Sequence, residues 1–155
     1  MASKKEKKTR KIVLASGVFD LLHLGHVRYL EEAKKAGGRN AELIVIVARD
    51  NTVENRKDKK PVIPENQRRA LVESLKVVDE AILGYENFSI EKVIEKLKPD
   101  VIAVGHDQEG MEQAVRKYVK KKRLKTRVVK ISKFGEDELD SSLKIKQKII
   151  EHFRR

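Results

Sequence analysis

The residue types that could do chemistry gather in one stretch, from Ser16 to His26. Two of its residues, His23 and His26, are three positions apart, with Gly25 between them. Residues at that spacing lie on the same side of a helical turn, so both imidazoles can face one ligand, and the glycine leaves room for that ligand to reach the backbone. Imidazole N–H groups can stabilise the charge that develops on phosphate oxygens during a transfer reaction. The pair therefore predicts a catalytic site for a nucleoside triphosphate.

The segments on either side of this stretch would position the two rings. Residues 12–15 form an apolar run typical of a strand, and residues 27–36 have the pattern of an amphipathic helix. A strand that turns through glycine into a helix brings backbone N–H groups and the positive helix end to one point, where phosphates bind. Both histidines could instead cap the helix or lie in the core. Asp20 could also cap the helix, or it could fix the tautomer of a histidine.

Strand and helix patterns alternate through the rest of the chain. Strands are expected at residues 43–48, 81–83, 101–104 and 128–131, and helices at 65–78, 90–97, 111–119 and 141–153. The segment 49–64 is expected to be a loop, and the last helix to place Ile145, Ile149 and Phe153 inward. Apolar strands that alternate with helices predict an α/β fold with an open five-stranded parallel sheet, covered by helices on both faces. Such sheets bind ligands at the carboxyl ends of the strands, where the strand order reverses.

Length and composition limit the class of protein. The 155 residues suit one domain, assigned to residues 12–155, after a flexible basic tail at residues 1–11. No run approaches the roughly 20 apolar residues of a membrane span, no signal peptide is visible, and there is no cysteine for a disulfide or a thiolate site. We expect a cytoplasmic protein without membrane contact. The net charge of +12 indicates anionic partners.

The stretch Gly17-x-Phe19-Asp20-x-x-His23-x-Gly25-His26 resembles the signature of the cytidylyltransferase-like nucleotidyltransferases. The segments 46–50, 59–69, 78–84, 98–102 and 105–108 resemble one branch of that family, the archaeal-type FAD synthases. This resemblance implies a Rossmann-like three-layer sandwich and an FMN adenylyltransferase, which moves AMP from ATP to FMN and releases pyrophosphate. Glycerol-3-phosphate cytidylyltransferase shares several of the segments, so a CTP-dependent transfer to glycerol-3-phosphate or a similar phosphorylated molecule is the alternative. A non-catalytic nucleotide-binding regulator is a more remote one.

The same resemblance assigns roles to residues by position. It makes His23 and His26 catalytic, in a nucleotide site with Gly17, Val18, Phe19, Leu24, Gly25, Asp107 and Phe134. Val18 and Phe19 would hold ATP through the turn, Leu24 and Gly25 would line the triphosphate, and Asp107 and Phe134 would lie near the ribose or the base. The Arg-Thr pair that opens the last helix in the cytidylyltransferases is absent, and only Ser141 and Ser142 remain. These hydroxyls could bind phosphate at a helix N-terminus or serve only as an N-cap.

Cations near the strand ends could neutralise the phosphates of the substrates. Lys57 and Lys60 are candidates for mobile clamps on the substrate phosphate, although residues 56–60 could equally be a solvated loop. Arg68, one turn into the following helix, is the candidate for a fixed, bidentate catalytic contact.

What the sequence lacks limits the other partners. The basic run at residues 116–127 contains one aromatic residue, Tyr118, so it is interpreted as a solvated helix end, and no nucleic acid is expected. His106 and His152 have no partners at ligand spacing, so no metal site made by protein groups is expected. A divalent ion, with Mg²⁺ as the first candidate, would arrive with ATP and bind its phosphates. By analogy with the family, a homodimer stays open.

Overall fold

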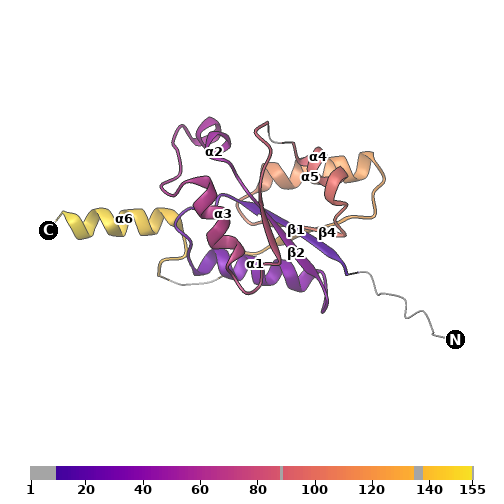
Figure 1. Cartoon of the computed structure of the whole chain (residues 1–155), viewed down its shortest axis with the longest axis horizontal. Coiled ribbons are helices and arrows are strands. Elements are labelled where there is room, and N and C mark those ends of the chain that lie inside the picture. Colours follow the sequence, from indigo (N-terminus) through magenta and orange to yellow (C-terminus); the bar gives the residue numbers. More distant parts are fainter. Residues whose placement is uncertain (1–9, 88, 135–137, 155) are drawn as a thin grey trace.

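A parallel sheet forms the centre of the fold in the computed structural model, which describes residues 10–87, 89–134 and 138–154. Over these residues, five strands pair in the order β3-β2-β1-β4-β5, all of them parallel (Figure 1). They are β1 (Ile12–Gly17), β2 (Glu42–Val47), β3 (Glu80–Leu83), β4 (Val101–Gly105) and β5 (Arg127–Ile131). In the middle strand, Ala15 lies beside Val45 of β2 and Ala103 of β4.

Helices cover both faces of this sheet. The helices α1 (Leu24–Ala36) and α3 (Glu65–Glu73) pack on one face, where Leu30, Ala33 and Val72 join a buried cluster with the strands. The helices α4 (Ile90–Leu97) and α5 (Glu109–Lys121) pack on the other, through Val93, Ile94, Val115 and Tyr118. The predicted three-layer α/β sandwich with a five-stranded parallel sheet is therefore confirmed.

Side-chain alternation explains why the strands have continuous apolar sequences. In β1, Val13 and Ala15 belong to the buried cluster under α1 and α3, whereas Leu14 belongs to the cluster under α4 and α5. Successive side chains of a strand point to opposite faces, and both faces are covered here. The strand order reverses between β1 and β4, so the loops that leave their carboxyl ends open a crevice between them.

One helix appears where a loop was expected. The helix α2 (Asp50–Lys57) occupies the first half of the segment after β2. The prediction missed it because its one buried residue, Val53, gives no apolar periodicity. Asp50 stands in its first turn and Arg56 and Lys57 in its last, an arrangement that favours the helix dipole. The following helix, α3, ends at Glu73 rather than at residue 78, so that prediction was too long.

The last helix, α6 (Ser142–Phe153), begins close to the position predicted but does not bury its apolar side chains. Ile145 is half-buried, as expected. Ile149 is 47% exposed and Phe153 is 80% exposed, so the expectation that these two face inward is wrong. Figure 1 shows the reason, because α6 extends away from the sheet to one end of the molecule. A helix that leaves the body after its first turn has no surface of its own chain to cover that face.

The predicted basic tail falls mostly on residues 1–9, which lie outside the described residues; Arg10 and Lys11 are exposed and belong to no helix or strand. Among the helices that the structure describes, none has the length and apolar character needed to cross a membrane.

Candidate active site

A cavity of about 1110 Å³ lies at the carboxyl ends of the strands. Its walls come from the turn after β1, from α2 and the segment that follows it, from the loops after β4 and β5, and from the start of α6. These are the loops in which the sequence places most of the candidate residues. The crevice expected at the reversal of strand order is therefore present.

His23 and His26 lie together on the wall of this cavity. Their rings stack with centroids 3.7 Å apart and an interplanar angle of 23°. His23 is the N-cap residue of α1, and His26 stands three positions further on, so the spacing in the sequence produces the stack. Neither ring lies in the apolar interior, since both side chains are partly exposed to the cavity.

The protonation of His26 follows from its surroundings. Its Nδ1 atom accepts a hydrogen bond of 3.2 Å from the backbone N–H of His23, so the exchangeable proton resides on Nε2. Burial, together with the neighbouring His23 ring, lowers the pKa of His26 to about 3, although Asp20 acts in the opposite direction. The ring is therefore neutral at pH 7 and offers Nε2–H as a hydrogen-bond donor.

His23 is neutral for a similar reason. Burial lowers its pKa and outweighs the attraction of Asp140. Within the described part of the chain, its buried Nδ1 atom has no hydrogen-bond partner. An unpaired acceptor lone pair costs less than an unpaired N–H, so the proton of this ring also belongs on Nε2. The stack thus carries two neutral imidazoles with N–H donors for an anion in the cavity.

Gly25, between the two histidines, packs closely against the segment before α6. A Cβ atom at Gly25 would stand 2.7 Å from the carbonyl oxygen of Asp140 and 3.0 Å from the His23 ring. The space that a side chain would need at this position is therefore taken up by the segment before α6. Gly25 still lines the cavity, and its small size lets α6 begin next to the histidine stack.

The turn before the histidines has an unusual backbone. Phe19 and Leu21 adopt φ angles of 55° and 49°, a left-handed conformation that is uncommon for residues with side chains. The Phe19 ring is buried in the core under α1, and its centroid lies 5.3 Å from the centroid of the His26 ring. Packing of this ring therefore helps to hold both the turn and His26 in position.

Asp20 has neither of the roles that the sequence left open, so both interpretations are corrected. Its side chain is buried, and its two carboxylate oxygens accept hydrogen bonds of 2.9 and 3.0 Å from the backbone N–H groups of Val62 and Ile63. The Nζ atom of Lys146 lies 3.7 Å away, and the Ser142 hydroxyl donates to the Asp20 backbone carbonyl. Asp20 thus ties the histidine turn to the segment after α2 and to the start of α6.

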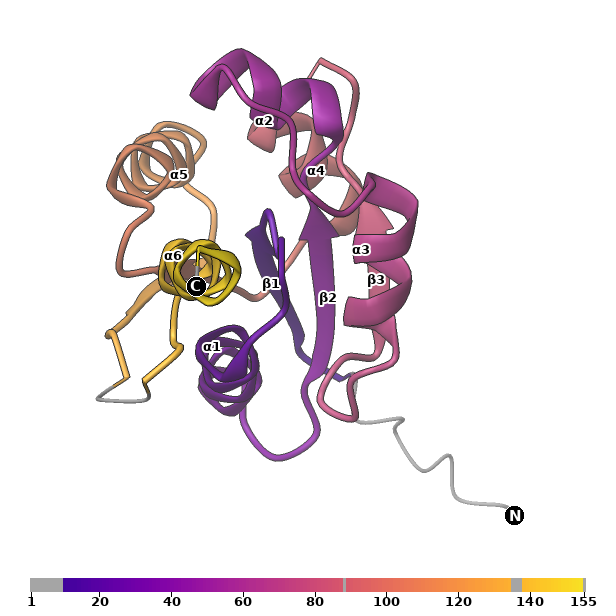
Figure 2. The ribbon, with the colours of Figure 1, turned by 90° about the vertical axis from the view of Figure 1, so that its left-hand side faces the viewer.

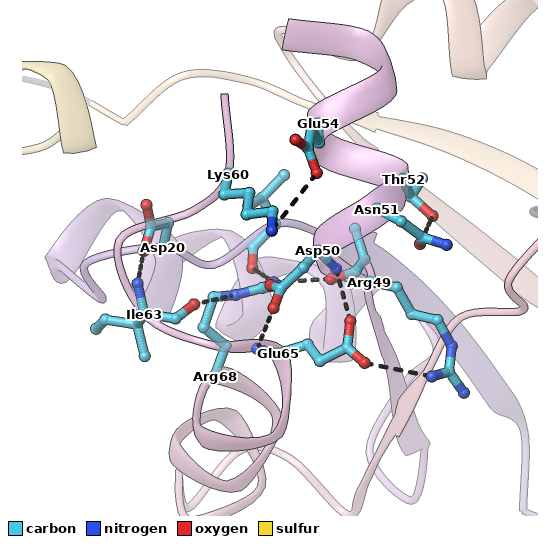
Figure 3. A network of polar contacts seen from close by, with 12 residues as sticks. Asp20, Arg49, Asp50, Asn51, Thr52, Glu54, Lys60, Ile63, Glu65 and Arg68 are labelled. Carbon is cyan, nitrogen blue, oxygen red and sulfur yellow. Dashed lines mark hydrogen bonds and ion pairs between the residues drawn. The ribbon is translucent and has the colours of Figure 1, made fainter. Parts of the chain in front are cut away.

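Arg68 also differs from its prediction. Its guanidinium is 0% exposed, does not line the cavity, and donates to four protein oxygens. The acceptors are the carbonyl oxygens of Ile63 (2.8 Å), Val18 (2.7 Å) and Ala48 (2.8 Å) and the carboxylate of Asp50 (2.7 Å), as drawn in part in Figure 3. With its donors committed in this way, Arg68 is a positioning residue that joins the ends of β1 and β2, and the expected contact with a phosphate is wrong.

A second layer of polar contacts supports this arginine. The Glu65 carboxylate accepts from the Asp50 backbone N–H (2.6 Å) and from the Arg49 guanidinium (3.3 Å), and Arg49 donates to the Gly84 carbonyl (2.6 Å). Figure 3 shows these groups converging where α2 and α3 begin. The network fixes the direction in which α2 leaves the sheet.

The remaining candidates divide into those on the cavity wall and those outside it. The wall includes Gly17, Val18, Phe19, Lys57, Lys60, Asp107, Phe134, Ser141 and Ser142. Leu24 is 46% exposed and is not part of that wall. Ser141 is the N-cap of α6, since its hydroxyl accepts from the Lys144 backbone N–H at 3.2 Å.

Lys146 is a cavity residue that the sequence reasoning missed. It lies on α6, and its ammonium group is held near Asp20 while the side chain stays 44% exposed. The signal that could have found it is its spacing, because position 146 lies one helical turn beyond Ser142, on the same face. Lys57, Lys60 and Lys146 bring positive charge to the cavity from α2, from the segment after it and from α6.

The donor set for a metal ion is sparse. Among residues 10–87, 89–134 and 138–154, no group of three His, Asp or Glu side chains is arranged to hold an ion. The cavity wall offers single carboxylates instead, such as the exposed Asp107. That set fits an ion bound mainly by the phosphate oxygens of a ligand, with at most one protein carboxylate.

Comparison with known proteins places the chain among nucleotidyltransferases. Residues 14–148 match the family described as Cytidylyltransferase-like. The chain belongs to this family. The matched region contains the histidine stack, the buried arginine and every residue of the cavity wall.

Several relatives in the family are similar over most of their length. The chain is 50% identical to a protein named FAD synthase from Methanothermus fervidus over 136 residues, which cover 88% of this chain and 92% of the relative. It is 51% identical to one of the same name from Ferroglobus placidus over 140 residues, covering 90% and 88%. A crystal structure titled as a lipopolysaccharide core biosynthesis protein from Thermoplasma volcanium aligns with a TM-score of 0.73 and 45% identity, over 82% of this chain and 100% of that one.

Proposed function

We propose that the protein is an FMN adenylyltransferase, which transfers AMP from ATP to FMN and yields FAD and pyrophosphate. The observation that carries this proposal is the near-full-length similarity, at about half of all positions, to relatives named FAD synthase. The cavity supports it, because two neutral histidines and several lysines surround a space large enough for two phosphorylated substrates. Pockets for one drug-sized ligand span roughly 300–1,000 Å³.

In the proposed reaction, a phosphate oxygen of FMN attacks the α-phosphorus of ATP. A new P–O bond forms, the bond from the α-phosphorus to the bridging oxygen breaks, and pyrophosphate leaves with that electron pair. The FMN phosphate is already an anion, so no protein base has to generate the nucleophile. The protein must instead hold two anions in line and stabilise the charge on the departing oxygens.

The histidine stack suits the second of these tasks. The Nε2–H groups of His23 and His26 would donate to the oxygens of the α-phosphate and to the bridging oxygen. Because both rings are neutral at pH 7, each would bind phosphate through an N–H donor and not as a cation. The backbone around Val18 and Phe19 would hold the nucleotide, and Ser141 and Ser142 would add hydroxyl donors.

The lysines would reduce the repulsion between the substrates. Lys57 and Lys60 would contact the FMN phosphate, and Lys146 the triphosphate. A divalent ion bound to the phosphates of ATP, with Mg²⁺ as the first candidate, would supply further charge neutralisation, and Asp107 is a wall carboxylate that could contact it. Asp107 and Phe134 would also lie near the ribose and the base.

A substrate panel tests the proposal. The protein is incubated with ATP or CTP and with FMN or glycerol-3-phosphate, and pyrophosphate and the coupled product are measured. We expect FAD from ATP and FMN, and little turnover in the other combinations. Turnover of CTP with glycerol-3-phosphate alone would favour the cytidylyltransferase alternative, and tight ATP binding without turnover would favour a regulator.

We also propose that the protein forms a homodimer through α6. Ile149, Ile150 and Phe153 expose 47%, 50% and 80% of their surface on a helix that extends beyond the body of the molecule. An isolated 12-residue helix is only marginally stable in water, so packing of this apolar face against another surface would stabilise α6. A second α6, packed antiparallel across a two-fold axis, would cover the same apolar residues on both copies.

A further inference from the structure

The cavity wall carries apolar side chains in addition to its cations and histidines. Its lining includes Val53 from α2, Ile90 at the start of α4 and Met111 near the start of α5. We call these three residues the α2–α4–α5 corner. Figure 2 shows α2, α4 and α5 in the upper part of the view, with α6 and α1 below them. No role has yet been given to this corner.

Two residues of the corner are held in place by the core. Ile90 and Met111 pack against the buried cluster on the sheet face that α4 and α5 cover. Val53 is itself buried and is the only buried residue of α2, a helix whose every position the structure describes. Apolar side chains that are fixed by packing and yet line a cavity form a surface for an apolar ligand group without needing to be ordered first.

The corner is also continuous with a phosphate-binding surface. Val53 and Lys57 are four residues apart on α2, so they lie on the same face of that helix, and both line the cavity. A ligand that rests its apolar part on Val53 therefore has a cation within about one helical turn for its phosphate. The ligand that this arrangement fits is an anionic phosphate joined to a sizeable apolar ring.

We propose that this corner binds the isoalloxazine ring of FMN, an assignment that rests on the proposed function. The apolar faces of the ring would pack against Val53, Ile90 and Met111, and its dimethylbenzene end forms no hydrogen bonds. The thioether of Met111 suits contact with an aromatic ring. The pyrimidine end carries donors and acceptors, and Ser89 and Glu91, which flank Ile90 on the cavity wall, can pair with it.

The part of the cavity wall that comes from the loops after β4 and β5 suits the adenine better. It carries the exposed polar side chains of His106, Asp107, Ser132 and Lys133, with Phe134 as its aromatic residue. Adenine is smaller than isoalloxazine and has a hydrogen-bonding edge, so polar groups beside one aromatic ring can recognise it. The two ring systems would then occupy different parts of the same cavity, with their phosphates meeting at the histidine stack.

Two variants that change polarity with little change in volume test the assignment: Val53→Thr and Met111→Gln. FMN binding is followed by quenching of flavin fluorescence, and FAD synthesis gives KM for each substrate. We expect the FMN Kd and KM to rise about tenfold in each variant, because each places a polar group against an apolar ring. The KM for ATP should stay within about twofold of the wild type. The matched controls are Val62→Thr and Leu71→Gln, exposed residues outside the cavity wall, which should leave both KM values unchanged.

The outcomes separate this proposal from the proposed function. A wild-type protein that neither binds FMN nor forms FAD would overturn the function. A wild-type protein that forms FAD, together with folded variants whose FMN affinity is unchanged, would overturn the corner as the flavin site. So would variants in which the KM for ATP rises as much as the KM for FMN. Melting curves identify a variant that fails to fold, in which case the other variant decides.

Discussion

The Nδ1 atom of His26 accepts a hydrogen bond from the backbone N–H of His23, the residue whose ring stacks on it. One contact therefore caps the first turn of α1 and fixes the tautomer of a ring on the cavity wall. Because Nδ1 is committed to the backbone, Nε2 is left as the donor for a ligand. The same residue contributes to the fold and to the proposed chemistry, and these two contributions can be separated experimentally.

Two replacements of His26 separate its contribution to stability from its contribution to catalysis. His26→Asn keeps a side-chain acceptor near the Nδ1 position but has no group at Nε2, whereas His26→Ala loses both. We expect kcat for FAD synthesis to fall about 10²–10³-fold in both variants, since each lacks one donor to the transition state. Only the alanine variant should also lose about 1 kcal/mol of stability, the usual cost of a lost cap. Near-normal turnover in either variant would refute the catalytic role.

The low pKa of His26 predicts how stability depends on pH. In the unfolded chain this histidine has an ordinary pKa near 6.5, while burial lowers the pKa to about 3 in the folded protein. Between these values the unfolded state binds the additional proton, so this group makes stability fall as pH decreases below 6.5. From pH 7 to pH 5 the loss should be on the order of 1–2 kcal/mol, measured by urea unfolding.

The His26→Asn variant is the control for this pH effect, because it removes the titrating group and keeps the fold. Carboxylates titrate in both proteins and cancel in the comparison. The wild type should therefore lose about 1–2 kcal/mol of stability relative to the variant as pH falls from 7 to 5. A difference that is constant across this range would show that the His26 pKa is close to normal.

Replacement of Arg68 should mainly lower stability, whereas replacement of His26 should mainly lower kcat. Arg68→Met leaves the Asp50 carboxylate and three backbone carbonyls without their donor, which should cost about 3–5 kcal/mol of stability. The matched control is Arg69→Met, which breaks the partly exposed pair with Glu73 and should cost less than about 1 kcal/mol. Denaturant unfolding measures both variants. A stable Arg68→Met protein without activity would instead assign Arg68 to phosphate binding.

Much of the fold could be predicted from the sequence because its signals are local. The continuous apolar runs predict the strands, and the turn with its glycines predicts the start of α1. The apolar residues at helical spacing predict α4 and α5 in the same way. The helix α2 could not be found in this way, because one buried valine makes no periodic pattern. The exposed face of α6 could not be found either, because an apolar stripe predicts a packing face whether or not the same chain covers it.

In the candidate site, too, the sequence predicts features that depend on local spacing and misses those that depend on distant partners. The histidines were found because three-residue spacing places two rings on one side of a helical turn whatever the rest of the chain does. Arg68 was misassigned because an arginine near strand ends looks the same in the sequence whether its partners are phosphates or carbonyls. Its partners come from positions 18, 48, 50 and 63, and only the folded chain brings these together. Lys146 was missed for the converse reason, since its closest charged partner, Asp20, is distant in sequence.

Lys146 can be tested against a lysine two residues away. Lys146→Met removes a cation from the cavity wall, whereas Lys144→Met removes one that pairs with Asp140 at 2.7 Å and does not line the cavity. We expect KM for ATP to rise about 10-fold or more in the first variant, the usual effect of losing a hydrogen bond to a charged group, and to change little in the second. Lys146→Arg should restore most of the affinity. Equal effects at positions 144 and 146 would indicate that only net charge matters.

The apolar face of α6 predicts an oligomeric state. If a second copy covers it, light scattering after size-exclusion chromatography should give twice the chain mass of 17.8 kDa. The double variant Ile149→Asp, Phe153→Asp should give a monomer, because charges placed in an apolar interface lose their hydration without gaining partners. Val62→Asp, at a residue that is 63% exposed elsewhere on the surface, is the control and should remain a dimer. A wild-type protein that is monomeric at concentrations near 100 μM would contradict α6 pairing, since interfaces of this kind hold stable dimers with far lower dissociation constants, on the order of 1 μM or below.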